Sequence, residues 1–477
     1  MGAVAQGGDS LVSVGNSALY NGSNYLSRTV GTGSQTKKSY TSLWKYNCNI
    51  ATDVNWQWGT QFERENLHIT SVGALSIYNV KSSVVQCQLI TTALFRDIGW
   101  YHIEVLFDTT QAVAANRNIL KVNGVRITDF TTETNFDQND TFASMGVSGK
   151  TCFINTYDGS TYTGDCYIAE FIHLDADPAG VVTGEFDSTG LYWTPKSSDE
   201  IKALTFGNEG FYLDNVTNPQ TDASGNGNNF TNNSTVTLST HTPTNTEFLW
   251  SSINITSGGT PIPVVSNGNR TALATGSNND AEVRMGGNLP FPSSGKWIAG
   301  AVVTDTGSGK GFGVWTDRTQ AVGMLNFGGL GGFHVSSDTY MYDCNGATVP
   351  HANMAATAVD DTLWLAVDID NQKLFFGQYD LSATTITWFA ADGDTDGNPS
   401  TGDNPSQASV DMAGATFGFV GFSSKIWTLV EEADIPFTMP TGFKFLNTTN
   451  IAAETTRTAS DTTKYFDTIL YEGNGGG

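Results

Sequence analysis

The acidic residues of the segment 184–190, G-E-F-D-S-T-G, come nearest to a catalytic pattern in this sequence. A retaining glycoside hydrolase directs two carboxyl groups into one cleft, and a strand reading E-x-D-x-x-E can supply them. Glu185 and Asp187 have the first spacing, but Gly190 or Leu191 stands where the third acid belongs. The neighbouring Gly and Ser predict a loop instead of a strand. We therefore predict no catalytic residue in this segment.

Other catalytic patterns are also missing from the sequence. It contains no G-x-S-x-G elbow, and its six scattered histidines form no recognisable pairing with Cys or Ser. The run T-G-S-G-K-G-F-G at residues 306–313 lacks the Ser or Thr that follows the lysine of a phosphate-binding loop. These features predict a protein that is not an enzyme and that needs no cofactor.

One acidic segment, A-D-G-D-T-D-G-N-P-S-T-G-D, has a spacing that could serve Ca²⁺. Asp392, Asp394 and Asp396 alternate, and Asp403 takes the place of the final Glu of a calcium loop. Against such a site, no helix pattern flanks the segment, and Pro399 replaces the usual apolar residue. A solvated acidic loop is the favoured interpretation, so we predict no metal ligand and keep Ca²⁺ as the alternative.

The stretch 210–230 starts as a short apolar strand and continues as D-A-S-G-N-G-N-N-F. Asp, Asn, Ser and Gly adopt positive φ or bond their own backbone, so they predict an ordered turn over residues 222–229. Asp214, Asp222 and Asn226 could offer oxygens to a metal ion, but the turn is the favoured interpretation.

Two tryptophans could form a platform for sugars. Trp56 and Trp58 stand two residues apart in D-V-N-W-Q-W-G, which places both on one face of a strand. Core packing is the favoured interpretation of this pair, and glycan stacking is the alternative.

The composition is that of an all-β protein. The 477 residues include 52 Gly, 15% charged residues and 11% aromatic residues, a mixture that supplies turns and strand-forming side chains. The formal net charge is −24. A surface this acidic repels phosphate groups, which excludes nucleic acid and anionic membranes as favoured partners.

The five cysteines are widely separated and form no C-x-x-C pair. Cys152 and Cys166 lie in segments with a strand-like sequence and are predicted to be buried apolar residues. The first ten residues show no secretory signal, and no apolar run reaches the length of a membrane span. These features predict synthesis and folding in a reducing cytoplasm.

Several segments predict particular strands and turns. Leu120 and Val122 should face Val125 and Ile127 across the turn Asn123-Gly124. Residues 101–107 have the period of a strand that packs on one face only. Residues 166–174 are apolar on both faces, which indicates a central strand. His173 on that strand is predicted to be a structural histidine. Further expectations are a hairpin within residues 363–376 and a short capped helix after Ser197, with Glu200 completing the capping box.

The polar, Thr-rich segment 231–248 predicts a flexible junction between two strand-rich regions. We predict an N-terminal arm (1–18), a first sandwich (19–245), a second sandwich (246–450) and a C-terminal extension (451–477). The extension contains one strand candidate, K-Y-F-D-T-I-L-Y, that should add to another sheet.

Seven blocks over residues 20–245 resemble the laminin-G-like, concanavalin A-like lectin domains of marine bacteriophage structural proteins. They are N-G-S-N-Y-L-S-R-T at Asn21, F-R-D-I-G-W-Y-H-I at Phe95, D-T-T-Q-A-V-A-A-N-R at Asp108, K-V-N-G-V at Lys121, Y-I-A-E-F at Tyr167, G-F-Y-L-D at Gly210 and D-A-S-G-N-G-N at Asp222. Residues 286–450 resemble a SPRY-type sandwich through S-G-K-W at Ser294, G-F-G-V-W at Gly311, W-L-A-V-D-I-D at Trp364, L-F-F at Leu374 and P-T-G-F-K-F-L-N at Pro440.

These resemblances imply two antiparallel jelly-roll-type sandwiches in a phage virion protein of a tail fibre or similar appendage. They imply a virion location, other virion proteins and a host-surface glycan as partners, and a homo-oligomer, with a trimer favoured. The alternatives are a cell-surface carbohydrate-binding adhesin, which the missing secretion signal disfavours, and a glycan depolymerase.

Overall fold

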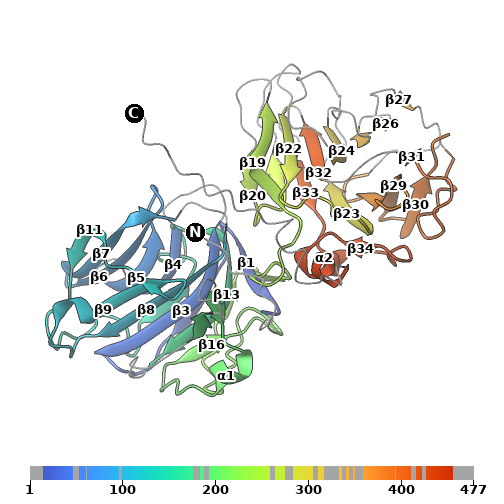
Figure 1. The fold of residues 1–477 in the computed structure, drawn as a ribbon. Helices are drawn as coiled ribbons and strands as arrows, with labels where there is room; N and C mark the ends of the chain where they lie inside the picture. The colour runs from blue at the N-terminus through green and yellow to red at the C-terminus, as the bar shows by residue number, and fades with distance from the viewer. Residues whose placement is uncertain are drawn as a thin grey trace, which may run out of the picture.

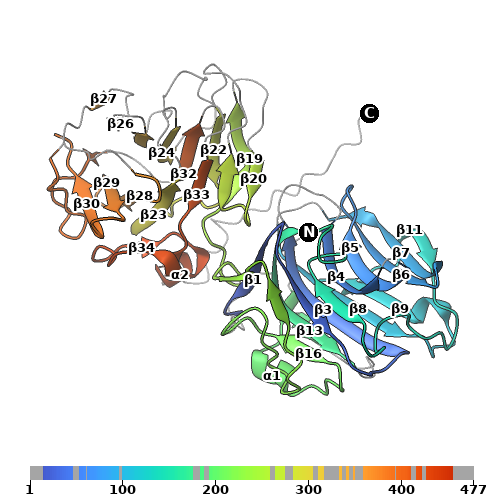
Figure 2. The ribbon, with the colours of Figure 1, turned by 180° about the vertical axis from the view of Figure 1, so that it is seen from behind.

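The computed structural model describes residues 14–454 except 47–52, 61, 96–98, 176–182, 187–192, 258–263, 274–282, 305–309, 316–331, 336–339, 343–347, 350–357, 393, 410–414 and 422–425. Figures 1 and 2 show two bodies of packed β-sheets, one from each half of the chain. The prediction of an all-β protein with two consecutive antiparallel sandwiches is confirmed. No helix among the described residues is long and apolar enough to cross a membrane.

The first sandwich consists of two sheets. The β13 sheet has the order β10 (Val125–Arg126), β9 (Asn118–Val122), β8 (Tyr101–Asp108), β3 (Lys37–Tyr46), β13 (Asp165–Leu174), β1 (Ser17–Asn21) and β18 (Thr237–Ser239), and β16 (Phe211–Leu213) also pairs with β13. The β4 sheet has the order β11 (Phe130–Thr134), β7 (Val84–Leu94), β6 (Ala74–Lys81), β5 (Glu63–Ile69), β4 (Asp53–Thr60), β12 (Thr151–Ile154), β2 (Tyr25–Thr29) and β17 (Thr231–Asn233).

The core of this sandwich lies between the two sheets. Tyr40 of β3 stacks on Trp56 of β4 at 4.2 Å between ring centroids, and Trp58 lies beside them. Both tryptophans are fully buried in this core. The prediction that they are core residues is confirmed, and they are not available as a sugar platform.

The outer face of the β13 sheet is covered by a second layer. Ile201 of α1 (Ser198–Lys202) and Phe206 pack on Ile172 of β13, while the hairpin of β14 (Gly184–Phe186) and β15 (Trp193–Pro195) sets Trp193 against His102. Strand β13 is therefore buried on both faces, as predicted. The one-sided burial predicted for residues 101–107 is wrong, because this cover also buries the polar residues of β8.

The second sandwich has the same two-sheet plan. The β32 sheet runs β19 (Trp250–Ser257), β22 (Val283–Gly287), β32 (Thr416–Gly421), β24 (Lys310–Trp315), β25 (Gly332–Val335), β26 (Tyr340–Tyr342) and β27 (Thr348–Val349). The β23 sheet runs β20 (Val264–Ser266), β21 (Thr271–Leu273), β33 (Ile426–Leu429), β23 (Lys296–Val303), β28 (Thr362–Asp368), β29 (Lys373–Asp380) and β30 (Thr385–Phe389). In addition, β31 (Gln407–Ala408) pairs with β29, and β34 (Lys444–Phe445) lies parallel to β23.

The β23 sheet is also buried on both faces. Its inner face packs Trp297, Leu365 and Phe376 into the core between the sheets. Its outer face is covered by the chain after β33, where Phe437 packs edge-on against Trp364. The hairpin predicted within residues 363–376 is confirmed as β28 and β29.

Local turn and cap signals are confirmed. Val125 pairs with Val122 across Asn123 and Gly124, whose φ values are 50° and 74°, as a two-residue hairpin turn of this kind requires. The Ser197 side chain accepts the backbone N–H of Glu200, whose own side chain accepts the backbone N–H of Ser197. Single-turn 3₁₀ helices occur at Ala114–Asn116 and Glu432–Asp434.

Three expectations differ from the structure. Strand β1 starts at Ser17, inside the predicted N-terminal arm, because β13 and β18 pair on either side of it. The predicted flexible junction 231–248 contains the edge strands β17 and β18, because pairing with β2 and β1 orders this polar segment. Helix α2 (Thr448–Glu454) occupies the start of the predicted extension. The strand candidate beyond it lies outside the described residues, and the predicted domain limits stay predictions.

Candidate functional site

A polar and aromatic surface lies on the outer face of the β4 sheet. Gln88, Tyr78, Asn66 and Gln57 stand directly opposite one another on β7, β6, β5 and β4. Their neighbours along each strand, among them Leu67 and Ile77, enter the core. Because strand side chains alternate, the row of four must point away from the core. Gln57 and Asn66 are nevertheless buried, whereas Tyr78 and Gln88 are half-buried.

Two further side chains complete this surface. The Arg64 guanidinium lies 4.9 Å from the ring centroid of Tyr78 and 5.0 Å from that of Tyr157. Tyr162 packs edge-on against Tyr157 at 5.7 Å and is 54% exposed. We call the set Gln57, Arg64, Asn66, Tyr78, Gln88, Tyr157 and Tyr162 the amide–tyrosine face.

The loop after β12 carries the two outer tyrosines, and its own hydrogen bonds fix it. The Asp158 carboxylate accepts the backbone N–H of Ser160 and of Thr161, each at 2.9 Å, together with both hydroxyls. The Gln57 side-chain amide donates to the Tyr157 carbonyl, which holds the loop on the sheet. Tyr157 and Tyr162 are thus presented by a structured loop.

The electrostatics of this face follow from partial burial beside one cation. Burial raises the pKa of the Tyr157 phenol, and Arg64 acts in the opposite direction. Burial, together with Arg64, lowers the pKa of His68 to about 4, so the imidazole is neutral near pH 7. The part of the face that solvent reaches therefore consists of the Arg64 guanidinium, the Gln88 amide and the tyrosine rings. Such groups stack on sugar rings and exchange hydrogen bonds with hydroxyls.

The segment 184–190, for which we predict no catalytic residue, shows no carboxylate pair among the described residues. Glu185 lies on β14 with an exposed side chain, and Asp187 lies outside the described residues. The prediction of a loop is wrong for Gly184–Phe186, because β15 pairs with this segment.

The acidic segment 392–403 forms an exposed loop. The Asp392 carboxylate accepts the backbone N–H of Asp394 at 3.2 Å, and Asp396 accepts the Asn404 side chain at 2.9 Å. Asp403 pairs through its backbone with Asn398. No group of three or more acidic, His or Cys side chains suited to a metal ion occurs among the described residues.

The Asp and Asn side chains of the stretch 210–230 hold its turn. Asp222 accepts the backbone N–H groups of Tyr212, Ser224 and Asn228 at 2.8–2.9 Å. The Asn226 amide donates to the carbonyls of Gly207 and Gly210, and Asp214 pairs with Lys202 at 3.2 Å. The turn interpretation is confirmed by these contacts.

The predicted structural histidine and cysteines lie in the first core. His173 is buried, stacks on Tyr40 at 4.3 Å, and bonds the Ser39 carbonyl through Nδ1. Cys152 and Cys166 are buried free thiols. Burial raises the pKa of the Cys166 thiol and lowers that of His173, which keeps both groups uncharged.

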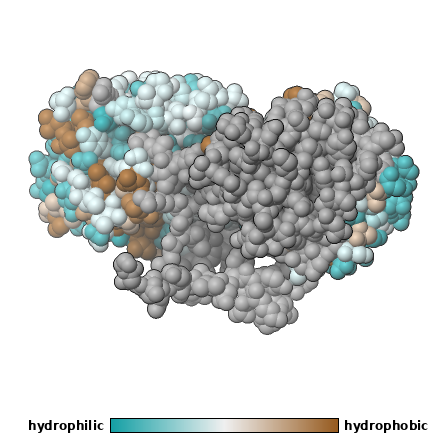
Figure 3. All heavy atoms as spheres, turned by 90° about the horizontal axis from the view of Figure 1, so that it is seen from above, coloured by the Kyte–Doolittle hydropathy of each residue, from teal (hydrophilic) through white to brown (hydrophobic). Residues whose placement is uncertain are grey.

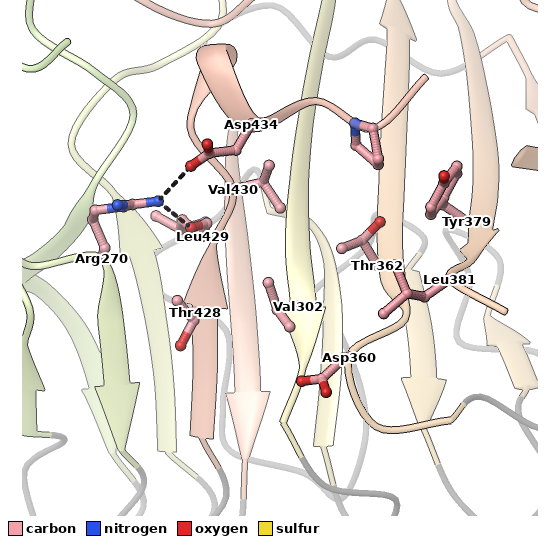
Figure 4. Close-up of a pocket in the computed structure, with 11 residues that line it drawn as sticks. Arg270, Val302, Asp360, Thr362, Tyr379, Leu381, Thr428, Leu429, Val430 and Asp434 are labelled. Atoms are coloured by element: carbon pink, nitrogen blue, oxygen red, sulfur yellow. Dashed lines mark hydrogen bonds and ion pairs between the residues drawn. The ribbon is translucent and has the colours of Figure 1, made fainter. Parts of the chain in front are cut away.

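A pocket of about 240 Å³ lies on the outer face of the β23 sheet (Figure 4). Its lining is largely apolar, with Val302, Tyr379 and Val430 among its walls. Arg270 at its edge bonds the Leu429 carbonyl at 3.2 Å and lies 3.8 Å from Asp434. These lining residues do not pair a nucleophile with a base.

A second space lies beside Glu170 and is too small to admit a water molecule. Glu170 sits at a strand irregularity with φ 51° and accepts the Tyr212 hydroxyl. Burial raises the pKa of Glu170 to about 7. The second layer closes this space, so it offers a substrate no entry.

Sequence patterns missed the amide–tyrosine face because its residues come from four strands and a loop. Each strand shows its alternation separately, but the register that lines up Gln57, Asn66 and Tyr78 exists only in the folded sheet. Figure 3 shows hydrophobic patches scattered among hydrophilic ones on the described surface of the first sandwich as seen from above.

No family model and no curated protein matches this chain. Among solved structures, mouse laminin α1 chain domains LG4-5 are 10% identical, with a TM-score of 0.31, covering 90% of this chain and 91% of that chain. The SPRY domain of human HERC1 is 11% identical, with a TM-score of 0.26, covering 38% and 98%. A pentraxin from Limulus polyphemus is 11% identical, with a TM-score of 0.27, covering 35% and 79%. These are distant structural similarities to laminin G, pentraxin and SPRY domains; the two all-β sandwiches are shown by the sheet topology described above.

Proposed function

We propose that this chain is a non-enzymatic structural protein of a phage tail fibre or similar surface appendage. In this proposal the first sandwich binds a host-surface glycan through the amide–tyrosine face. The seven-block sequence resemblance supports the appendage role. A homo-oligomer, with a trimer favoured, is part of the same proposal.

The observation that carries the glycan role is the Arg64 guanidinium beside the rings of Tyr78 and Tyr157, with the half-buried Gln88 amide opposite Tyr78. Tyrosine rings offer apolar faces to the C–H surfaces of sugars, and amides both donate and accept hydrogen bonds. The net charge of −24 repels polyanions, so the ligand class is a neutral glycan.

Binding of neutral and of carboxylated polysaccharides to the purified chain tests the glycan role. We expect Tyr157→Ala and Arg64→Ala each to weaken binding of the neutral polysaccharide by roughly tenfold, since each removes a stacking partner. Phe186→Ala, an exposed aromatic on the β14–β15 hairpin, is the matched control and should bind as the wild type does. Equal binding by all three variants would contradict the assignment of this face.

Electron microscopy of virions with a label on this protein tests the appendage role. Label on a fibre or fibre-like projection is the expected result, and absence of the protein from purified particles would contradict it. Light scattering of the full chain measures the proposed trimer.

A further inference from the structure

The two sandwiches are tied where β13 of the first meets the β20–β21 turn of the second. Asp165 accepts the backbone N–H groups of Asn267 at 2.7 Å and Gly268 at 2.9 Å. The Tyr167 hydroxyl donates to the Gly268 carbonyl at 2.9 Å. Three hydrogen bonds thus join this turn to β13.

The segment between the sandwiches is bonded on both sides. The His241 ring packs against Tyr167 at 4.8 Å, and its Nδ1 accepts the backbone N–H of Glu247 at 3.1 Å. On the other side, the Thr246 carbonyl accepts the N–H of Thr448, and the Glu247 carbonyl accepts the Asn288 side chain. A substitution of Glu247 is therefore expected to affect contacts on both sides of the joint.

Carboxylates concentrate at this joint. Glu431 accepts the Ser239 hydroxyl of the first sandwich at 2.9 Å and pairs with Arg270 at 2.9 Å. Arg270 is labelled in Figure 4. Glu247 is 2% exposed; one carboxyl oxygen accepts Thr240 and Asn245, and the other finds no hydrogen-bond partner among the described residues.

The charge state of Glu247 follows from these surroundings. Burial raises its pKa to about 7, and the neighbouring carboxylates of Glu431 and Glu432 add to that rise. Tyr167 on β13 and His241 in the connecting segment also face it. Glu247 is neutral at mildly acidic pH and gains a charge near neutrality.

We propose that protonated Glu247 locks the two sandwiches together and that its ionisation loosens the joint. An ionised Glu247 places a third carboxylate beside Glu431 and Glu432. Opening the joint returns this carboxylate to water, where its repulsion from Glu431 and Glu432 is screened.

The direction of the pH effect follows from proton linkage. The closed joint raises the pKa of Glu247 to about 7, so the closed state binds the proton more tightly than an opened state with an ordinary Glu. Closure is therefore favoured at low pH and weakens as pH rises through about 7. With an ordinary Glu pKa in the open state, the ratio of open to closed molecules rises roughly seventyfold between about pH 5 and pH 8.

Hydrogen–deuterium exchange of the full chain tests this lock. Protection of residues 240–249 and 264–270 is measured from about pH 5 to pH 8 and corrected for intrinsic exchange rates. We expect protection in the wild type to fall by roughly the seventyfold given above. In Glu247→Gln, which mimics the neutral acid, protection should stay high throughout.

Two variants sharpen this test. Glu432→Gln removes a carboxylate that raises the pKa of Glu247 in the closed joint, so the fall should be smaller and should level off at a lower pH. This variant decides the question if Glu247→Gln does not fold. Asp53→Asn is the control for the contact between Asp165 and the β20–β21 turn, because Asp53 is a buried carboxyl beside Asp165. Protection in this variant should still fall with rising pH as it does in the wild type. A wild type without pH dependence, a fall that persists in Glu247→Gln, or a fall lost only in Asp53→Asn would overturn the proposal.

Discussion

Asp222 shows how one side chain organises a polar stretch. Its two carboxyl oxygens accept three backbone N–H groups from both ends of the turn, and it is 8% exposed. The neighbouring glycines take the conformations that this turn requires, with φ of 90° at Gly225 and 74° at Gly227. Asp222, which could have been a metal ligand, thus serves as a hydrogen-bond acceptor for the backbone of its own turn.

We expect Asp222→Ala to destabilise the protein by about 2–4 kcal/mol, because three N–H groups lose a charged acceptor. Urea unfolding measures this loss. Asp214→Ala is the control: its carboxylate accepts one backbone N–H, from Val216, and pairs with a partly exposed lysine, so a smaller loss of about 1 kcal/mol is expected. Equal losses in both variants would show that the turn does not depend on Asp222.

At the scale of secondary-structure elements, the second layer over the β13 sheet matters because it buries the outer face of that sheet. Gly124 lies directly under the Trp193 ring, where an added Cβ would come within 2.3 Å of a ring carbon. The same hairpin encloses His102, whose Nε2 lies 3.3 Å from the Thr183 hydroxyl. Burial, with Lys121 as a smaller cause, lowers the pKa of His102 to about 3.

This buried histidine predicts a loss of stability in acid. The unfolded chain binds a proton at about pH 6.5 and the folded chain does not. The stability that His102 contributes is therefore complete above about pH 6.5 and declines as pH falls, by about 1.4 kcal/mol per pH unit. We expect His102→Phe to lose about 2–3 kcal/mol less than the wild type between pH 7 and pH 4.5 in denaturant unfolding.

Thr183→Val is the control for this comparison. It removes the hydrogen bond to His102 and leaves the titrating group in place, so its pH dependence should match that of the wild type. If His102→Phe and the wild type lose the same stability in acid, the buried neutral histidine is not the cause.

The whole molecule depends on how the two sandwiches meet. Gly268 has φ 69°, and a Cβ at this position would lie 2.1 Å from the Tyr167 hydroxyl oxygen. The joint therefore depends on a residue that belongs to neither core.

We expect Gly268→Ala to separate the two bodies without unfolding them. Small-angle scattering should show a larger radius of gyration, and thermal unfolding should split into two transitions because neither core is altered. Gly149→Ala, another positive-φ glycine with open space around it, is the control and should keep the wild-type radius. An unchanged radius in Gly268→Ala would contradict the role of this turn.

The sequence by itself determined the strand-rich fold, the Asn123-Gly124 hairpin, the Ser197 capping box and the burial of Trp56 and Trp58. These features rest on local propensity and on alternation within one strand, which short segments encode directly. Only the tertiary structure decided that the segment 231–248 holds edge strands and that the polar side of β8 is buried. It also decided that Gln57, Asn66 and Tyr78 form one row and that Glu247 lies at the joint. Each of these depends on pairing register or on a covering layer, and both arise from contacts between residues far apart in the chain.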